Sequence, residues 1–139
     1  MLQQSSIVEF TIRQTEIIQI QLQNILEYES GMVLYRKAIR DKIPEIIKKS
    51  GGSCNVKKLS DDEFLPELEK KLREEVEEYF ESKSVEELVD AIEVIYRVAE
   101  LKGTSKEKLE MLREEKASKR GKFNENLFLV DTTEEESVS

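Results

Sequence analysis

The chain has 139 residues, 38% of them hydrophobic, and a formal net charge of −8. It contains no histidine and one cysteine, Cys54, which excludes an internal disulfide and disfavours a zinc site. Residues 61–90 hold thirteen acidic and four basic side chains, and this local charge of −9 disfavours binding to a nucleic-acid backbone. Basic residues gather instead at 36–49 and 113–122, on either side of the acidic centre, as suits a small polyphosphate ligand. No stretch approaches the ~20 consecutive apolar residues of a membrane span, and the N-terminus lacks a secretory pattern, so we expect a cytoplasmic protein without a membrane segment.

Residues 1–31 differ in composition from the rest and are predicted to be an N-terminal extension. They contain six glutamines, no lysine and only five charged residues. Apolar residues at helical spacing favour a helix, although part of the segment also fits the alternation of a strand. We expect the helix to end at Gly31. Its apolar stripe would consist of Ile18, Leu22, Ile25 and Leu26.

Residues 32–130 are predicted to form one helical domain, with helices expected at 41–50, 60–81, 84–101 and 104–121. Asp41 is the expected N-cap of the first. Ser60 and Ser84 each stand three residues before a glutamate, which is the spacing of a capping box. The second and third helices are separated by so few residues that they must fold back antiparallel, so we predict an all-α fold, an antiparallel helical bundle. The apolar segment 126–130 is expected to dock on this domain, and residues 131–139 are expected to form an acidic disordered tail.

Two pairs of acidic residues flank that short connection: Glu75 and Glu78 before it, Glu87 and Asp90 after it. Within each pair the residues are three apart, so they share one face of a helix. In an antiparallel hairpin with a rise of ~1.5 Å per residue, all four come to similar heights on facing helices. Converging carboxylates repel unless a cation lies between them, and hard oxygen ligands in this number suit Mg²⁺ or Mn²⁺. The pattern therefore predicts a metal site suited to metal-assisted hydrolysis of a phosphoanhydride.

The alternative is a solvated acidic face, and Glu87 has a second role available as the capping partner of Ser84. Two features favour the metal site. At ~100° per residue, Glu75 borders the apolar stripe of its helix. Val94 projects beside both acids of the other helix, which are therefore expected to be partly desolvated and to need a metal or a lysine as compensation. The buried faces are expected to comprise Leu65, Leu68, Leu72, Val76 and Tyr79 on one helix and Leu88, Ala91, Ile92, Ile95, Val98 and Ala99 on the other.

Three stretches of the sequence resemble one protein family. Residues 74–78 (EEVEE) followed by 87–90 (ELVD) resemble the EExxE…ExxD pattern of MazG-like nucleotide pyrophosphohydrolases, members of the all-α NTP pyrophosphatase superfamily. Residues 35–47 (YRKAIRDKIPEII) resemble the opening of small single-domain members, and 113–123 resembles their basic ending. Arg36 and Ala38 depart from the usual residues of the opening motif.

This resemblance implies Mg²⁺-dependent cleavage of a nucleoside triphosphate between the α and β phosphates, giving a monophosphate and pyrophosphate. It implies that Glu75, Glu78, Glu87 and Asp90 hold the metal and that Glu74 is a further ligand or positions the attacking water. It also implies a homodimer or homotetramer in which helices of neighbouring subunits complete the site. Candidate phosphate contacts are Lys37, Arg40, Lys42, Lys116 and Arg120.

Three other functions fit the same sequence. A phosphoribosyl-ATP pyrophosphohydrolase shares the superfamily and the chemistry. A non-catalytic helical interaction module would need no metal and would release no product. A regulatory protein that binds nucleotide without turnover would bind it tightly with metal and would release no product. Hydrolysis assays with and without Mg²⁺ separate these possibilities.

Overall fold

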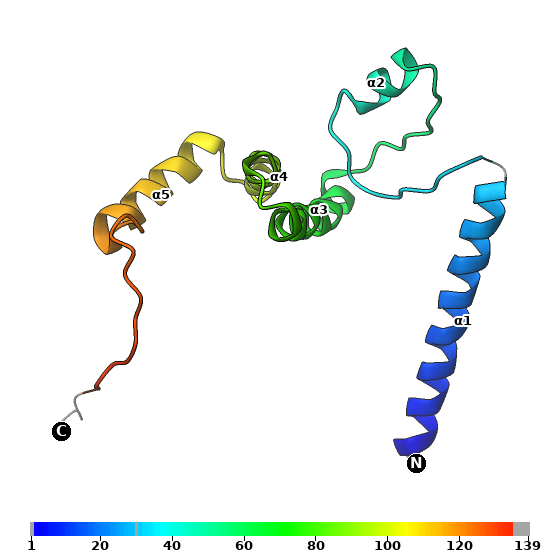
Figure 1. The fold of residues 1–139 in the computed structure, drawn as a ribbon, viewed down its shortest axis with the longest axis horizontal. Helices are drawn as coiled ribbons and strands as arrows, with labels where there is room; N and C mark the ends of the chain where they lie inside the picture. Colours follow the sequence, from blue (N-terminus) through cyan, green and yellow to red (C-terminus); the bar gives the residue numbers. More distant parts are fainter. Residues whose placement is uncertain (1, 30, 135–139) are drawn as a thin grey trace. The chain divides into compact units, whose positions relative to one another are not determined.

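The computed structural model describes residues 2–29 and 31–134, and the side chains of residues 6–22 and 31–134. Within this part of the chain there are five α-helices and no strand, which confirms the all-α class (Figure 1). The chain divides into two compact units, Met1–Ile39 and Arg40–Ser139. The extension at 1–31, the domain at 32–130 and the tail at 131–139 stay predictions, and residues 135–139 lie outside the described part.

The first unit contains α1, which spans Leu2–Glu29. The helical prediction for this segment is confirmed, and the strand alternative is wrong. Two threonines satisfy their hydroxyls inside the helix, because Thr11 and Thr15 each donate to the carbonyl one turn earlier, at 2.8 and 2.9 Å. In the expected apolar stripe, Ile18 and Leu22 are exposed. Ile25 and Leu26 lie outside the residues whose side chains the structure describes.

The second unit opens with a turn and a short helix, α2, spanning Ile43–Lys49. The N-cap is Lys42, without a side-chain capping bond, so the prediction of Asp41 was wrong. Asp41 and Lys42 lie in a turn, closed by the Ile43 N–H donating to the carbonyl of Arg40 at 3.1 Å, so α2 begins one residue later than an N-cap at Asp41 would place it. This turn places Arg40 at the start of the unit, ahead of the helix pair that carries the acids.

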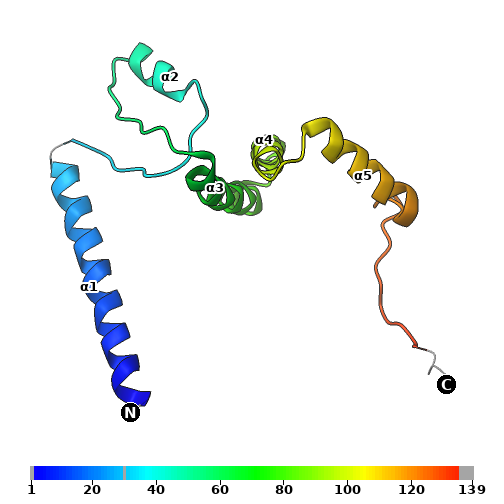
Figure 2. The ribbon, with the colours of Figure 1, turned by 180° about the vertical axis from the view of Figure 1, so that it is seen from behind.

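That helix pair consists of α3, Asp61–Ser82, and α4, Val85–Leu101. The capping box at Ser60 is confirmed: its hydroxyl accepts from the Glu63 N–H at 3.2 Å, and its own N–H donates to the Glu63 carboxylate at 3.3 Å. Lys83 ends α3 in the left-handed region (φ 57°), and its N–H donates to the Tyr79 carbonyl at 2.7 Å. The connection is two residues long, so α3 and α4 lie side by side as an antiparallel hairpin (Figures 1 and 2).

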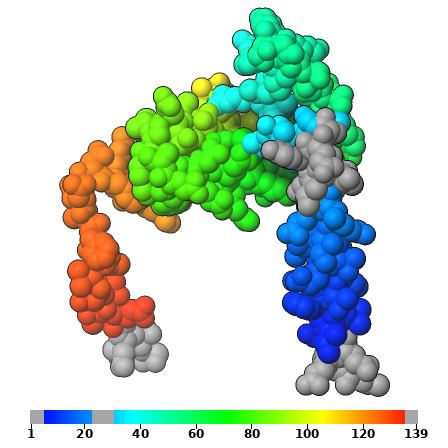
Figure 3. All heavy atoms as spheres, turned by 45° about the vertical axis from the view of Figure 1, so that its right-hand side comes forward, coloured from blue at the N-terminus to red at the C-terminus, as the bar shows by residue number. Residues whose placement is uncertain are grey.

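The last helix, α5, spans Lys106–Arg120 and contacts α4. Ser105 caps it by accepting from the Lys108 N–H at 3.2 Å. The segment after α5, orange to red in Figure 3, stands apart from α3 and α4. Residues 127–130 are all strongly exposed, so the prediction that this segment docks on the domain was wrong for this chain taken alone.

The core of the second unit is thin and lies along the hairpin. Its buried apolar side chains are Leu68 on α3 and Ala91 and Val94 on α4. The fourth buried side chain of this hairpin is charged: Glu75 is only 4% exposed. The least exposed side chain in the described part of this unit is therefore a carboxylate.

Candidate metal centre

The α3–α4 hairpin brings acids from both helices together. Carboxylate oxygens of Glu75 on α3 and of Glu87 and Asp90 on α4 all lie within 4.8 Å of one another. Glu75 is buried, and the two acids of α4 are half-buried. Three of the four predicted metal ligands therefore converge across the hairpin.

The fourth predicted ligand joins a second group. Oxygens of Glu78, Glu74 and Glu75 lie within 4.8 Å of one another, so Glu75 belongs to both groups. At ~100° per residue, Glu74 and Glu78 lie about 100° and 60° to the same side of Glu75 around α3. Glu74 and Glu78 therefore extend the cluster along α3, and both are rotated around the helix away from the direction in which Glu75 meets the acids of α4. We call these five acids the acidic cluster.

Glu75 is more deeply buried than the sequence predicts, because the packed face of α3 is centred closer to it than expected. Leu68 and Glu75 are seven residues apart, two helical turns, and are the two buried side chains of α3. Val76, expected in the buried stripe, is 40% exposed. Glu75 therefore lies at the centre of the packed face and not at its border.

The packed face of α4 is also the acidic one. The prediction that Val94 lies beside the acids agrees with its burial, and Ala91 is buried with it. Leu88, Ile92 and Ile95, expected in the core, are exposed. Around α4 they lie roughly 100–160° from Val94, whereas Glu87 and Asp90 lie within about 40° of it.

Glu87 is not used as a helix cap. Ser84 is the N-cap of α4, but its hydroxyl accepts from the N–H of Glu86 at 3.2 Å. The capping box predicted between Ser84 and Glu87 was therefore wrong. The Glu87 carboxylate instead faces Glu75 and Asp90.

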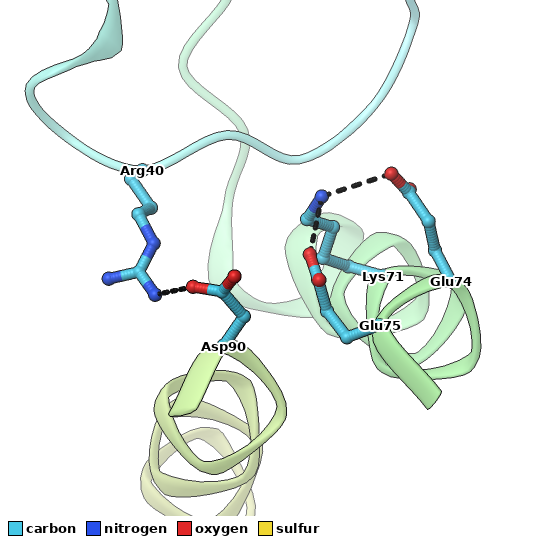
Figure 4. A network of polar contacts seen from close by, with 5 residues as sticks. All are labelled: Arg40, Lys71, Glu74, Glu75 and Asp90. Atoms are coloured by element: carbon cyan, nitrogen blue, oxygen red, sulfur yellow. Dashed lines mark hydrogen bonds and ion pairs between the residues drawn. The ribbon is translucent and has the colours of Figure 1, made fainter. Parts of the chain in front are cut away.

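Two basic side chains neutralise part of the acidic cluster (Figure 4). The Lys71 ammonium lies 2.7 Å from a carboxylate oxygen of Glu75 and 3.1 Å from one of Glu74. Arg40 reaches from the turn before α2 and donates to the Asp90 carboxylate. Burial lowers the pKa of Lys71, but its bonds to Glu75 and Glu74 raise it, and the net pKa lies above its ordinary value.

Among the five predicted phosphate contacts, Arg40 lies at the acidic cluster, because it pairs with Asp90. Lys37 belongs to the first unit, where its ammonium lies 5.7 Å from the centre of the Tyr35 ring. Lys42, Lys116 and Arg120 are exposed. Elsewhere in the basic ending, Arg113 pairs with Glu110 and Glu114, and Lys119 pairs with Glu115 along α5 itself.

Lys71 is the residue that the sequence reasoning missed. The available signal was its spacing, because a lysine three and four residues before two glutamates shares their helix face. The sequence predicted that a metal or a lysine would compensate the desolvated acids, but it did not indicate which lysine.

The donor set suits a hard divalent cation: it consists of carboxylate oxygens, at least three of them close together, and one carboxylate is buried. Searches of protein-family models, of curated proteins and of solved structures found no match to this chain. No helix among the described residues is long and apolar enough to cross a membrane. The assignment of function therefore rests on the motifs and on the geometry of the acidic cluster.

Proposed function

We propose that this protein is a Mg²⁺-dependent nucleoside triphosphate pyrophosphohydrolase that cleaves between the α and β phosphates. One observation carries the proposal: carboxylate oxygens of Glu75, Glu87 and Asp90 lie within 4.8 Å of one another across the α3–α4 hairpin, with Glu75 4% exposed. These residues, with Glu78, are the ones that the resemblance to MazG-like enzymes assigns to the metal. Mn²⁺ would suit the same donors.

Each residue then has a role in the proposed reaction. Glu75, Glu78, Glu87 and Asp90 would hold the divalent cation, which would neutralise charge on the triphosphate and act as a Lewis acid. Glu74 would accept a proton from the water whose oxygen attacks the α phosphorus. As that bond forms, the bond from the α phosphorus to the bridging oxygen breaks, and pyrophosphate leaves with the electron pair.

Arg40 would contribute by binding a phosphate oxygen. Its side chain is 53% exposed and its guanidinium pairs with Asp90, so it lies at the open side of the acidic cluster. A guanidinium offers planar, paired donors that match phosphate oxygens. If the Arg40 guanidinium moved from Asp90 to a phosphate oxygen, the Asp90 carboxylate would be free to bind the cation.

We also propose that a second copy of the chain covers the outer face of α4, giving a homodimer or homotetramer. Leu88, Val89, Ile92 and Ile95 are exposed on one side of this helix, with Val85 at its start. A contiguous apolar face of this kind is typical of an interface. Copies related by a two-fold axis would cover it with the same residues.

A pyrophosphate-release assay tests the proposed activity. The full chain is incubated with common and modified nucleoside triphosphates and with phosphoribosyl-ATP, with Mg²⁺ or with a chelator. We expect a monophosphate and pyrophosphate in equal amounts, only with the divalent cation. Release of orthophosphate and a diphosphate, or no product from any substrate, would overturn the proposal.

The ion pairs of the acidic cluster favour one other candidate, a non-catalytic helical module. Lys71 and Arg40 already neutralise part of the cluster, as they would in a purely structural network. Such a module predicts no Mg²⁺-dependent product and no specific stabilisation by Mg²⁺. The same assay, together with the thermal melts described below, decides between the two.

A further inference from the structure

Lys71 differs from an ordinary surface lysine of α3. Its side chain is 19% exposed, and its ammonium contacts two carboxylates, Glu75 at 2.7 Å and Glu74 at 3.1 Å. The adjacent Lys70 is 73% exposed and pairs with Glu67 at 2.8 Å. The two lysines stand one position apart on the same helix, but only Lys71 enters the acidic cluster.

Local helix geometry does not account for the Lys71–Glu75 pair. A lysine four residues before a glutamate is the weaker orientation of an i,i+4 pair, and exposed pairs contribute little to stability. The burial of Glu75 gives the stronger reason. A carboxylate removed from water needs a compensating charge, and Lys71 is the cation in contact with it.

We infer that Lys71 is a built-in counter-cation of the acidic cluster, which a divalent cation must displace from Glu75. The inference rests on the proposed metal site and adds a competitor that sets its affinity. Lys71 stabilises the cation-free fold by compensating Glu75. It lowers the affinity of the cluster for a divalent cation by the same interaction.

Displacement follows from the position of Glu75. This carboxylate is the member shared by both groups of oxygens within 4.8 Å, so a cation held by either group would use it. A divalent cation lies ~2.0–2.6 Å from its oxygen ligands, which would bring it within a few ångströms of the ammonium. Like charges that close repel strongly. The ammonium has Glu74 as a second partner, so it keeps one ion pair when it leaves Glu75.

Calorimetric titration of the full chain with MgCl₂ tests the inference without any turnover. The variants are Lys71→Met and the matched control Lys70→Met. We expect Lys71→Met to bind Mg²⁺ about tenfold more tightly than wild type, within the ~5–150-fold range typical of coupled ligands. Lys70→Met should bind as wild type does. In chelator, Lys71→Met should melt at a lower temperature than the other two proteins, and Mg²⁺ should restore it.

Each other outcome is informative. If wild type binds Mg²⁺ and Lys71→Met binds it equally or more weakly, the inference is overturned while the proposed metal site stands. If none of the three proteins binds Mg²⁺, the metal site itself is rejected and the inference with it. If Lys71→Met does not fold, Lys71→Gln and Lys71→Arg replace it. Tighter binding by the glutamine variant than by the arginine variant then supports competition, and equal binding refutes it.

Discussion

Replacing Glu75 by glutamine should abolish Mg²⁺-dependent stabilisation while leaving the cation-free fold almost unchanged. The substitution removes one charge and keeps the shape of the side chain. It removes repulsion from Glu87 and Asp90 and from Glu74 and Glu78, two groups whose oxygens lie within 4.8 Å of Glu75, and it removes attraction to Lys71 at 2.7 Å. The net effect depends on which of these charge interactions is larger.

The distances give the size of each contribution. At an effective dielectric constant of ~20, two unit charges 4.8 Å apart repel by about 3.5 kcal/mol, and the ion pair at 2.7 Å attracts by about 6 kcal/mol. The repulsions from Glu87 and Asp90 nearly cancel the attraction to Lys71, and those from Glu74 and Glu78 add to the repulsive side, although Lys71 also neutralises part of the Glu74 charge at 3.1 Å. The Asp90 side chain is 39% exposed, so solvent screening weakens its repulsion of Glu75. We therefore expect the free energy of unfolding in chelator to be unchanged or to rise by about 1 kcal/mol.

The effect in the presence of Mg²⁺ should be much larger. A ligand at ~100 times its dissociation constant stabilises the folded state by about 2.7 kcal/mol. For a domain of this size that corresponds to a rise in Tm on the order of 10 °C. Wild type should show this rise with MgCl₂ but not with NaCl of equal ionic strength. Glu75→Gln should lose it, together with pyrophosphate release.

Glu77→Gln is the matched control. Glu77 is exposed on α3 and lies on the far side of that helix from Glu75, at about 200° around it. It should keep both the Mg²⁺ response and the activity. If Glu77→Gln lost the Mg²⁺ response as completely as Glu75→Gln, the assignment of faces on α3 would be wrong. If wild type showed no response, the metal site would be refuted.

Four further outcomes are expected. Asp90→Asn should abolish Mg²⁺-dependent pyrophosphate release while the circular dichroism spectrum stays that of wild type, and a spectrum of lost helix would contradict a purely functional role. Leu68→Ala, at a position 6% exposed, should lower the free energy of unfolding in urea by ~2–4 kcal/mol, whereas Leu129→Ala at an exposed position should change it little. Ile92→Glu on the outer face of α4 should lower the mass measured by light scattering, and an unchanged oligomer would place the interface elsewhere. A chain starting at Met32 should keep metal-dependent hydrolysis, and loss of activity in a folded truncated chain would show that α1 helps to build the site.

The helix pattern of this protein could be predicted because its signals are local. The capping box at Ser60 and the short break before Ser84 fix where α3 begins and where the chain reverses, and both depend on neighbouring residues only. The grouping of Glu75, Glu87 and Asp90 followed from that reversal together with helical spacing. No knowledge of the rest of the fold was required.

The direction of packing could not be predicted in the same way. Apolar residues surround most of α4, so periodicity leaves open which side meets α3. The side that carries Glu87 and Asp90 is the packed one, and Leu88 is exposed. That outcome depends on Arg40, fifty residues from Asp90, and on Lys71 of the other helix, because these cations make the acidic side compatible with burial. Charge compensation between distant residues is not visible in the pattern of one helix.

The α3–α4 hairpin has acidic side chains on its packed inner side and aliphatic side chains on the outer side of α4, the reverse of an ordinary amphipathic helix pair. Its inner side holds carboxylates beside Ala91 and Val94, and the outer side of α4 presents aliphatic side chains to solvent. A helix pair that stood alone would gain more by burying the aliphatic side. The arrangement is consistent if both sides have a partner: cations inside, from Lys71 and Arg40 or from a divalent ion, and a second copy of the chain outside. Loss of the inner cation and loss of the outer partner should therefore destabilise the same hairpin. On this reasoning, Mg²⁺ binding and self-association should strengthen each other.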